Sequence, residues 1–337
     1  MSTQILRASQ RDWIAARSSA LVNGLEQDAC VLGLDVSFLG NDSRIIDCGV
    51  NTRGSVEAGR RITEISHGGM ASARIEMVNV AGHMLPKLWV DSWLPKLSAY
   101  GLQVSVPLSE IDPAIRISGP ILSRFAHNRL HARRKDLLAA AWGIAVVESE
   151  TLPTVEVAEA LAELSGLPAD HLLLLVVPTT SVAGVTQVAG RINESVVFTM
   201  EESLGIDCSC VSQILGSVPI ALSSSIGASS IVTPDDFIHY MGRICLTVDC
   251  SLDVDLANLA SQLTFRSTPI YGTLFSELLA SAGGVFEAIP GLIDLNKVAQ
   301  VTVIDQRSGA AFSAGECDES ILFGTHPNPE VNPKETL

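Results

Sequence analysis

The order of hydrophobic and polar blocks along the chain predicts strands and helices that alternate in sequence. Apolar residues recur at helical spacing over residues 5–27 and 150–166, where Thr154 is a candidate N-cap for the second helix. Short apolar runs separated by turn residues lie between these two helices. We expect these runs to be strands at residues 30–36, 43–50, 72–78, 87–91 and 142–148, with a loop at 112–120. Alternation of this kind is typical of a mixed α/β fold.

The longest of these apolar runs, residues 172–177, predicts a fully buried strand. Pro178 and the hydroxyl residues after it end the run and offer caps for a helix of small residues at 182–190. In such a helix Arg191 and Glu194 lie at i and i+3, on one face. A pair of this kind is usually a surface ion pair worth about 0.2–0.5 kcal/mol. Its neighbours here are small and apolar, so a pair that lines a pocket, with Glu194 as a general base, is the alternative.

The segment at residues 45–71 repeats the arrangement of strand, loop and helix. Its strand ends at Val50, a glycine-containing loop follows, and a helix begins near Ser55. His67-Gly68-Gly69 ends that helix as a glycine cap would. In the second half of the chain we expect a helix at 237–241, a strand at 245–254, helices at 257–262 and 271–282, and a hairpin at 298–305 and 309–313.

The length of 337 residues predicts two domains rather than one core. We place an N-terminal α/β domain at 1–150, a second α/β domain at 151–324 and a flexible tail at 325–337. Hydrophobic residues make up 47% of the chain and charged residues 18%, a composition that suits a large core and a homo-oligomer.

Charge and cysteine usage narrow the classes of partner. The net charge of −15 argues against nucleic acid, and no apolar run is long enough to span a membrane. The chain starts without a signal-peptide pattern, so we expect a cytoplasmic protein with free thiols. Neither its seven cysteines nor its seven histidines have metal-site spacing, and we expect no metal or prosthetic group. The basic run at 124–135 is either a solvated face or an anchor for an anionic ligand tail.

Three segments together resemble one protein family. They are IIDCGVNTRGSVEAGRRITEISHGGMA at 45–71, VVPTTSVAGVTQVAGRINE at 176–194, and the loop at 216–220 with VTPDDFIHYMGR at 232–243. All three are similar to runs of the methenyltetrahydromethanopterin cyclohydrolases. The resemblance spans nearly the whole chain.

This resemblance implies a two-domain α/β subunit with a cleft between the domains, assembled as a homo-oligomer, typically a trimer, without a metal. The implied reaction is hydrolysis of N5,N10-methenyltetrahydromethanopterin to N5-formyltetrahydromethanopterin. Glu194 would orient or deprotonate the water, and Arg191 would position Glu194. The matched motifs also imply a set of ligand-binding residues for the pterin: Asn51, Ser55, Glu57, Gly119, Pro120, Thr179, Ser181, Gln187, Gly216 and Pro219.

The sequence departs from the family pattern in its loops. The segment after Met241-Gly242-Arg243 is shorter, and the loop around Gly119 lacks a glycine and an arginine of the family. Two hypotheses follow. The chain is either a working cyclohydrolase with a reshaped pocket, or a diverged paralogue that binds a tetrahydromethanopterin-type pterin without hydrolysis, in cofactor biosynthesis or as a binding protein.

Overall fold

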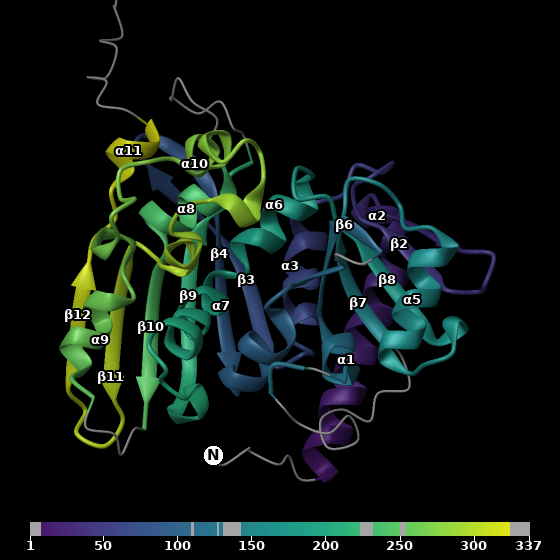
Figure 1. The fold of residues 1–337 in the computed structure, drawn as a ribbon, viewed down its shortest axis with the longest axis horizontal. Coiled ribbons are helices and arrows are strands. Elements are labelled where there is room, and N and C mark those ends of the chain that lie inside the picture. The colour runs from purple at the N-terminus through teal and green to yellow at the C-terminus, as the bar shows by residue number, and fades with distance from the viewer. Residues whose placement is uncertain are drawn as a thin grey trace, which may run out of the picture.

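The computed structural model describes residues 8–108, 111–126, 128–130, 143–222, 232–249 and 254–323. Two six-stranded mixed sheets lie side by side, with helices between them and on their outer faces (Figure 1). This arrangement confirms the predicted α/β fold in two parts. The cleft between the parts stays a prediction.

The first sheet has the strand order β1-β2-β8-β7-β6-β5. At its centre β2 (Arg44–Asp47), β8 (Leu172–Val176) and β7 (Gly143–Glu148) run parallel, so their carboxyl ends meet at one edge. All five residues of β8 are buried, as expected for a strand covered on both faces. The antiparallel flanking strands are β1 (Asp35–Phe38), β5 (Val106–Leu108) and β6 (Asp112–Ser118).

The second sheet has the order β12-β11-β10-β9-β4-β3. Its strands are β3 (Ala71–Val80), β4 (His83–Trp93), β9 (Val211–Pro219), β10 (Arg243–Val248), β11 (Gln300–Asp305) and β12 (Ala311–Gly315). Only β10 and β11 are parallel neighbours. The two sheets exchange strands across residue 150, because β3 and β4 join the second sheet and β8 joins the first. A division of the chain at residue 150 would therefore separate the hydrogen-bonded neighbours β7 and β8.

Three helices lie between the sheets: α3 (Val56–Ser66), α6 (Val182–Ala189) and α7 (Ile192–Phe198) (Figure 1). Helices α3 and α6 pack closely, since a Cβ added at Gly59 would lie 2.4 Å from the Ala183 carbonyl oxygen. Outside them, α1 (Ala8–Gln27), α2 (Ala29–Leu32) and α5 (Val155–Ser165) belong to the first part. The second part holds α8 (Pro234–Met241), α9 (Leu256–Gln262), α10 (Phe275–Ser281) and α11 (Glu319–Phe323).

The chain passes between the sheets at three connections. The first joins α3 to β3 through His67-Gly68-Gly69, and both glycines have a positive φ. The second leaves β4 and reaches β5 through a helical segment, η1 (Lys96–Gln103). The third is the α6–α7 segment, which links β8 to β9. The Gln103 side-chain amide joins all three, because its Nε2 donates to Ser66 Oγ at 3.1 Å and to the Gly190 carbonyl at 3.2 Å.

Most predicted elements are confirmed, and the exceptions have local causes. Residues 29–32 form helix α2, closed by Gly33 in the left-handed conformation, so the strand predicted at 30–36 was wrong over its first half. Residues 112–118, predicted as loop, pair with β5 and β7 as strand β6. Strand β10 is shorter than predicted, and α10 begins at Phe275 rather than Tyr271. The tail at 325–337 and half of the basic run at 124–135, namely residues 127 and 131–135, lie outside the described residues.

Candidate functional site

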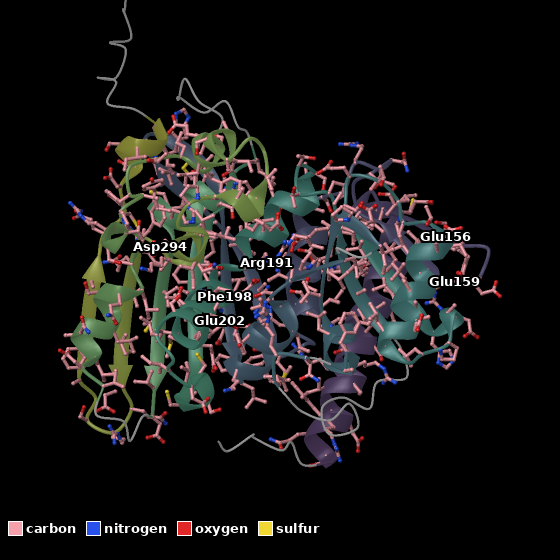
Figure 2. The ribbon with its side chains drawn as sticks, in the orientation of Figure 1. Glu156, Glu159, Arg191, Phe198, Glu202 and Asp294 are labelled. Carbon is pink, nitrogen blue, oxygen red and sulfur yellow. The ribbon has the colours of Figure 1, made fainter. Side chains whose placement is uncertain are left out.

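The sequence predicted that Arg191 lies within one helix. In the structure it lies at the junction of two helices. Helix α6 ends at Ala189, and Arg191 is the residue that precedes α7. The junction needs a glycine at position 190, because a Cβ there would lie 2.2 Å from Thr63 Oγ1 on α3. Figure 2 shows Arg191 near the middle of the molecule, between the two sheets.

Two glutamates hold the Arg191 guanidinium. Its Nε lies 2.8 Å from Glu194 Oε2, and its Nη1 donates to Glu148 Oε1 at the carboxyl end of β7. The Nη2 group donates to the Gln103 carbonyl at 2.6 Å, and Gln187 Nε2 donates to the same Glu148 oxygen at 3.0 Å. Only about a tenth of each charged side chain is exposed, with values of 11% for Arg191, 10% for Glu148 and 11% for Glu194. Arg191 and Glu194 therefore form a nearly buried triad with Glu148 and are not a surface ion pair.

Burial sets the protonation of this triad. Loss of water raises the pKa of Glu194 to about 7, and Glu148 adds to the rise while Arg191 opposes it. Burial by itself lowers the pKa of Arg191, but Glu148 and Glu194 raise it overall, so the guanidinium stays charged. Asp235, at the start of α8, has its pKa raised to about 6 by burial, by Asp236 and by Glu148. Near neutral pH, Glu194 can therefore take up and release a proton.

One oxygen of the Glu194 carboxylate is buried without an aligned hydrogen-bond donor. Its Oε2 atom is close to Arg191 Nε, yet it accepts no aligned hydrogen bond from the described residues. A carboxylate with a pKa near 7 and an oxygen without a hydrogen-bond donor suits a general base that removes a proton from water. Arg191 can hold this carboxylate in place and can face negative charge that develops beside it.

His67 adjoins the same site from the first connection. It is fully buried, and its Nδ1 lies 2.9 Å from the Thr63 carbonyl oxygen. Burial lowers the pKa of His67 to about 4, and the nearby Arg191 charge contributes to the decrease. The ring is therefore neutral at pH 7, and it adds a polar wall without a competing charge.

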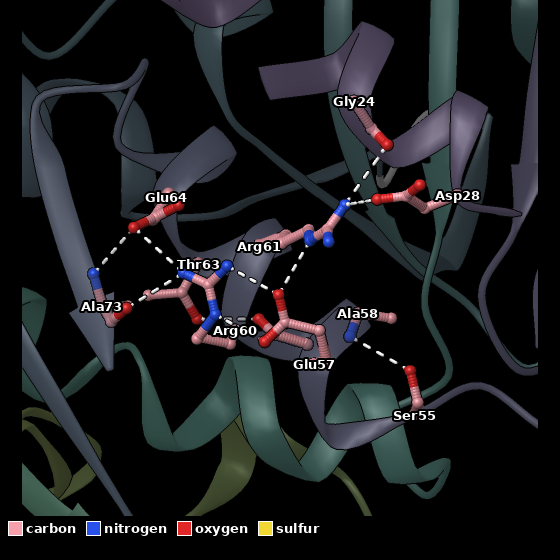
Figure 3. A network of polar contacts seen from close by, with 11 residues as sticks. Gly24, Asp28, Ser55, Glu57, Ala58, Arg60, Arg61, Thr63, Glu64 and Ala73 are labelled. Atoms are coloured by element: carbon pink, nitrogen blue, oxygen red, sulfur yellow. Dashed lines mark hydrogen bonds and ion pairs between the residues drawn. The ribbon is translucent and has the colours of Figure 1, made fainter. Parts of the chain in front are cut away.

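Three predicted ligand-binding residues follow β2. The Asn51 backbone N–H donates to Asp47 Oδ2 at 2.8 Å, and Asn51 is exposed. The Ser55 hydroxyl caps α3 by accepting from the Ala58 N–H at 3.1 Å. Glu57 forms ion pairs with two arginines of its own helix, Arg60 at 2.7 Å and Arg61 at 2.8 Å (Figure 3). Ser55 and Glu57 therefore already have partners within the chain.

Thr179 and Ser181 follow β8 at the same edge of the sheet. Thr179 is exposed, while the Ser181 hydroxyl caps α6 by accepting from the Gly184 N–H at 3.0 Å. A Cβ added at Gly49 would lie 2.4 Å from Ser181 Cβ, so the loop after β2 and the loop after β8 are in contact. Glu148 ends the neighbouring strand β7 at this edge. The carboxyl ends of parallel strands are where open α/β sheets bind ligands.

The other predicted ligand residues are more dispersed. Gly119 and Pro120 are buried after β6, where the Gly119 N–H donates to the Leu102 carbonyl at 2.7 Å. Gly216 lies under α7, because a Cβ there would be 2.2 Å from Asn193 Oδ1. Pro219 ends β9 beside Lys87 and lines a separate cavity. The structure groups Gln187, Arg191 and Glu194, and it places Gly216 against the α7 residue Asn193, while Pro219 lines a separate cavity.

Arg129, from the basic run, approaches the site from another side. It forms an ion pair with Glu202 at 2.8 Å, and its guanidinium carbon lies 5.4 Å from the centre of the Phe198 ring. Figure 2 shows Phe198 and Glu202 on the segment that continues from Arg191. The Arg129 charge also lowers the pKa of Glu194, although burial outweighs it.

The sequence interpretation missed Glu148, Gln103 and Asp235. Glu148 had a usable signal, since it is a carboxylate that directly follows the buried run of a parallel strand. Gln103 contacts Arg191 through its backbone carbonyl, which no sequence pattern marks. Asp235 lies within the motif at 232–243 but was given no role.

Comparisons with known proteins agree with these motifs. A family model described as Cyclohydrolase (MCH) matches residues 14–325. A methenyltetrahydromethanopterin cyclohydrolase of Methylobacterium organophilum is 32% identical over 92% of this chain and 96% of its own length. Proteins of the same name from Methanococcus maripaludis and Methanothermobacter thermautotrophicus are 29% and 27% identical, over 86% and 90% of this chain. The aligned regions cover 91% and 95% of the lengths of those two relatives.

Proposed function

Because this chain belongs to the cyclohydrolase (MCH) family, we propose that it hydrolyses the methenyl bridge of a tetrahydromethanopterin-type pterin to a formyl group. The proposal places the chain in pterin-dependent one-carbon metabolism. The observation that carries it is the buried Glu194 carboxylate, held by Arg191 and poised to exchange a proton near pH 7. Of the two hypotheses drawn from the sequence, this one has the support of the relatives' names and of the assembled triad.

The reaction asks little of the protein beyond placing one water. The methenyl carbon carries positive charge and is already electrophilic. Glu194 takes a proton from water as the water oxygen bonds to that carbon, which gives a neutral hydroxyl adduct. The bond from this carbon to N10 then breaks, N10 takes a proton, and the hydroxyl proton leaves as the N5-formyl carbonyl forms. One water is consumed and one proton is released overall.

Arg191 acts as a positioning residue in this scheme. Its guanidinium is fixed by Glu148 and by the Gln103 carbonyl, so it holds the Glu194 carboxylate from a rigid base. Glu148 is in turn oriented by Gln187, a predicted ligand residue that donates a hydrogen bond to it. A carboxylate held in this way loses little freedom when it takes up the proton.

The test follows the loss of methenyl absorbance with the purified protein and with Glu194→Gln. We expect a rate above the spontaneous reaction for the wild type and a loss of about 10²–10⁴-fold in kcat for the variant. Glu201→Gln is a matched control, because Glu201 is also a shielded, ion-paired carboxylate, but its partner is Lys96. A wild-type rate no higher than the spontaneous rate would refute the proposal.

Binding of the pterin to the same samples, measured by calorimetry, separates loss of chemistry from loss of the pocket.

The expected trimer, the cytoplasmic location and the lack of a prosthetic group remain predictions. Among the described residues no helix is both long and apolar enough to cross a membrane.

A further inference from the structure

A charged cavity lies at the end of the second sheet, and its lining includes no residue of the Arg191 triad. It has a volume of about 300 Å³ and forms where the β3–β4 hairpin, the end of β9, the start of β10 and the segment before α11 meet. Figure 1 shows this end of the sheet beside α11. Its polar lining residues are Asn79, Lys87, Arg243, Cys317 and Glu319.

Lys87 is buried here without a hydrogen-bonding partner of its own. Only 8% of the residue is exposed, and its Nζ lies 4.4 Å from the centre of the Trp89 ring. Among the described residues Lys87 forms no ion pair and donates no hydrogen bond. A buried ammonium that lacks a counter-charge is costly, so such groups are usually paired.

Arg243 brings a second positive charge to the same cavity. Burial lowers the pKa of Lys87, and the charge of Arg243 lowers it further, so the two cations are close enough to repel. Cys317 and Glu76 act in the opposite direction more weakly, and Glu76 is itself paired with Arg74. Burial raises the pKa of the Cys317 thiol, while Arg243 and Lys87 both oppose that rise. The two cations therefore act on one small region.

The carboxylate in the lining does not neutralise this charge. Glu319 Oε2 accepts a hydrogen bond from the Ala81 N–H at 3.1 Å, at the turn of the β3–β4 hairpin. In the part of the chain that the structure describes, no ion pair joins it to Lys87 or Arg243. Two cations against one carboxylate leave the cavity with a net charge of +1.

We propose that this cavity binds the phosphate or carboxylate group of a small molecule between Lys87 and Arg243. An anion there would supply the counter-charge that Lys87 lacks and would relieve its repulsion with Arg243. Arg243 can offer two parallel N–H groups, and Lys87 adds a point charge from the sheet. The volume is at the lower end of small-ligand pockets, so the bound part is an anionic group with few further atoms.

The cavity can be tested with inorganic phosphate as the probe, at constant ionic strength in chloride. The Trp89 ring is in contact with the Lys87 ammonium, so Trp fluorescence reports binding, with calorimetry as the second measurement. We expect saturable binding that weakens about tenfold or more in Lys87→Met and in Arg243→Met. Arg243 is exposed, so its variant should fold even if the Lys87 variant does not.

Arg74→Met is the matched control. Arg74 also lies over the Trp89 ring, at 4.9 Å, but it is paired with Glu76 at 3.0 Å and does not line the cavity. Its phosphate affinity should stay within about twofold of the wild type. Acetate in place of phosphate distinguishes a carboxylate ligand from a phosphate ligand, since the preferred group binds more tightly.

Non-saturating binding, or equal affinity in all these variants, would overturn the proposal. The inference does not depend on the proposed hydrolysis. Glu194→Gln should keep the wild-type phosphate affinity, so failure of one proposal can be told apart from failure of the other.

Discussion

The pKa of Glu194 makes a quantitative prediction about the pH dependence of hydrolysis. A general base works only when deprotonated, and burial raises the pKa of this carboxyl from the usual 4.5 to about 7. The rate should therefore be level above about pH 7 and fall about tenfold per pH unit below it. In Glu194→Gln the residual rate should lose this acidic limb.

The same group predicts a change in stability with pH. Because folding raises the pKa of Glu194, its contribution to stability is full below pH 4.5 and is lost as the pH rises through about 7. The difference between these two values corresponds to about 3 kcal/mol. Relative to the wild type, Glu194→Gln should thus gain about 3 kcal/mol in free energy of unfolding between acidic and alkaline pH.

Both measurements use the purified full chain. Initial rates of methenyl loss, corrected for the spontaneous reaction, give the pH–rate profile, and urea unfolding at pH 5 and pH 8 gives the free energies. The reasoning is refuted if the acidic limb lies near pH 4.5, or if the variant keeps the wild-type limb. A free-energy difference that does not change with pH would also contradict it.

Three further predictions concern the frame around the site. Arg191→Lys cannot hold its two glutamates at once, so kcat should fall by about 10²-fold or more with a smaller change in KM, measured in the same absorbance assay. Gly59→Ala should lower the free energy of unfolding by about 1–3 kcal/mol, because the new Cβ would lie 2.4 Å from the Ala183 carbonyl oxygen. Gly24→Ala, with open space around it, should instead raise the free energy of unfolding by about 0.5–1 kcal/mol. Equal effects of the two substitutions in urea unfolding would contradict the packing argument. Asp236→Ala should cost about 1–3 kcal/mol, since it leaves the Thr233 and Phe275 N–H groups without their acceptor, and a wild-type melting temperature would count against this.

Local sequence patterns were sufficient to predict most of the helices and strands. The apolar run of β8, the helix start near Ser55 and a hydroxyl cap after Pro178 were predicted correctly, because strand burial and helix capping depend on neighbouring residues. Thr154 occupies the predicted N-cap position of α5, but its side chain accepts no capping hydrogen bond. The exchange of strands between the sheets could not be predicted, since the pairing of β4 with β9 joins residues far apart in sequence.

In the candidate site, too, contacts between sequence neighbours could be predicted and contacts between distant residues could not. Arg191 and Glu194 are close in sequence, and their spacing indicated a contact. Glu148 and Gln103 lie 43 and 88 residues from Arg191, so only the tertiary structure brings them to it. Burial of the pair is the main cause of the raised pKa of Glu194, and the charge of Glu148 adds to it.

The three connections between the sheets have a mechanical consequence. They meet at one place, where Gln103 bonds to Ser66 and Gly190, and Arg191 follows directly in the chain. Any rotation of one sheet relative to the other would therefore have to be accommodated at this place. Glu194 is three residues beyond Arg191 on the same segment, so such a rotation would also re-aim the carboxylate.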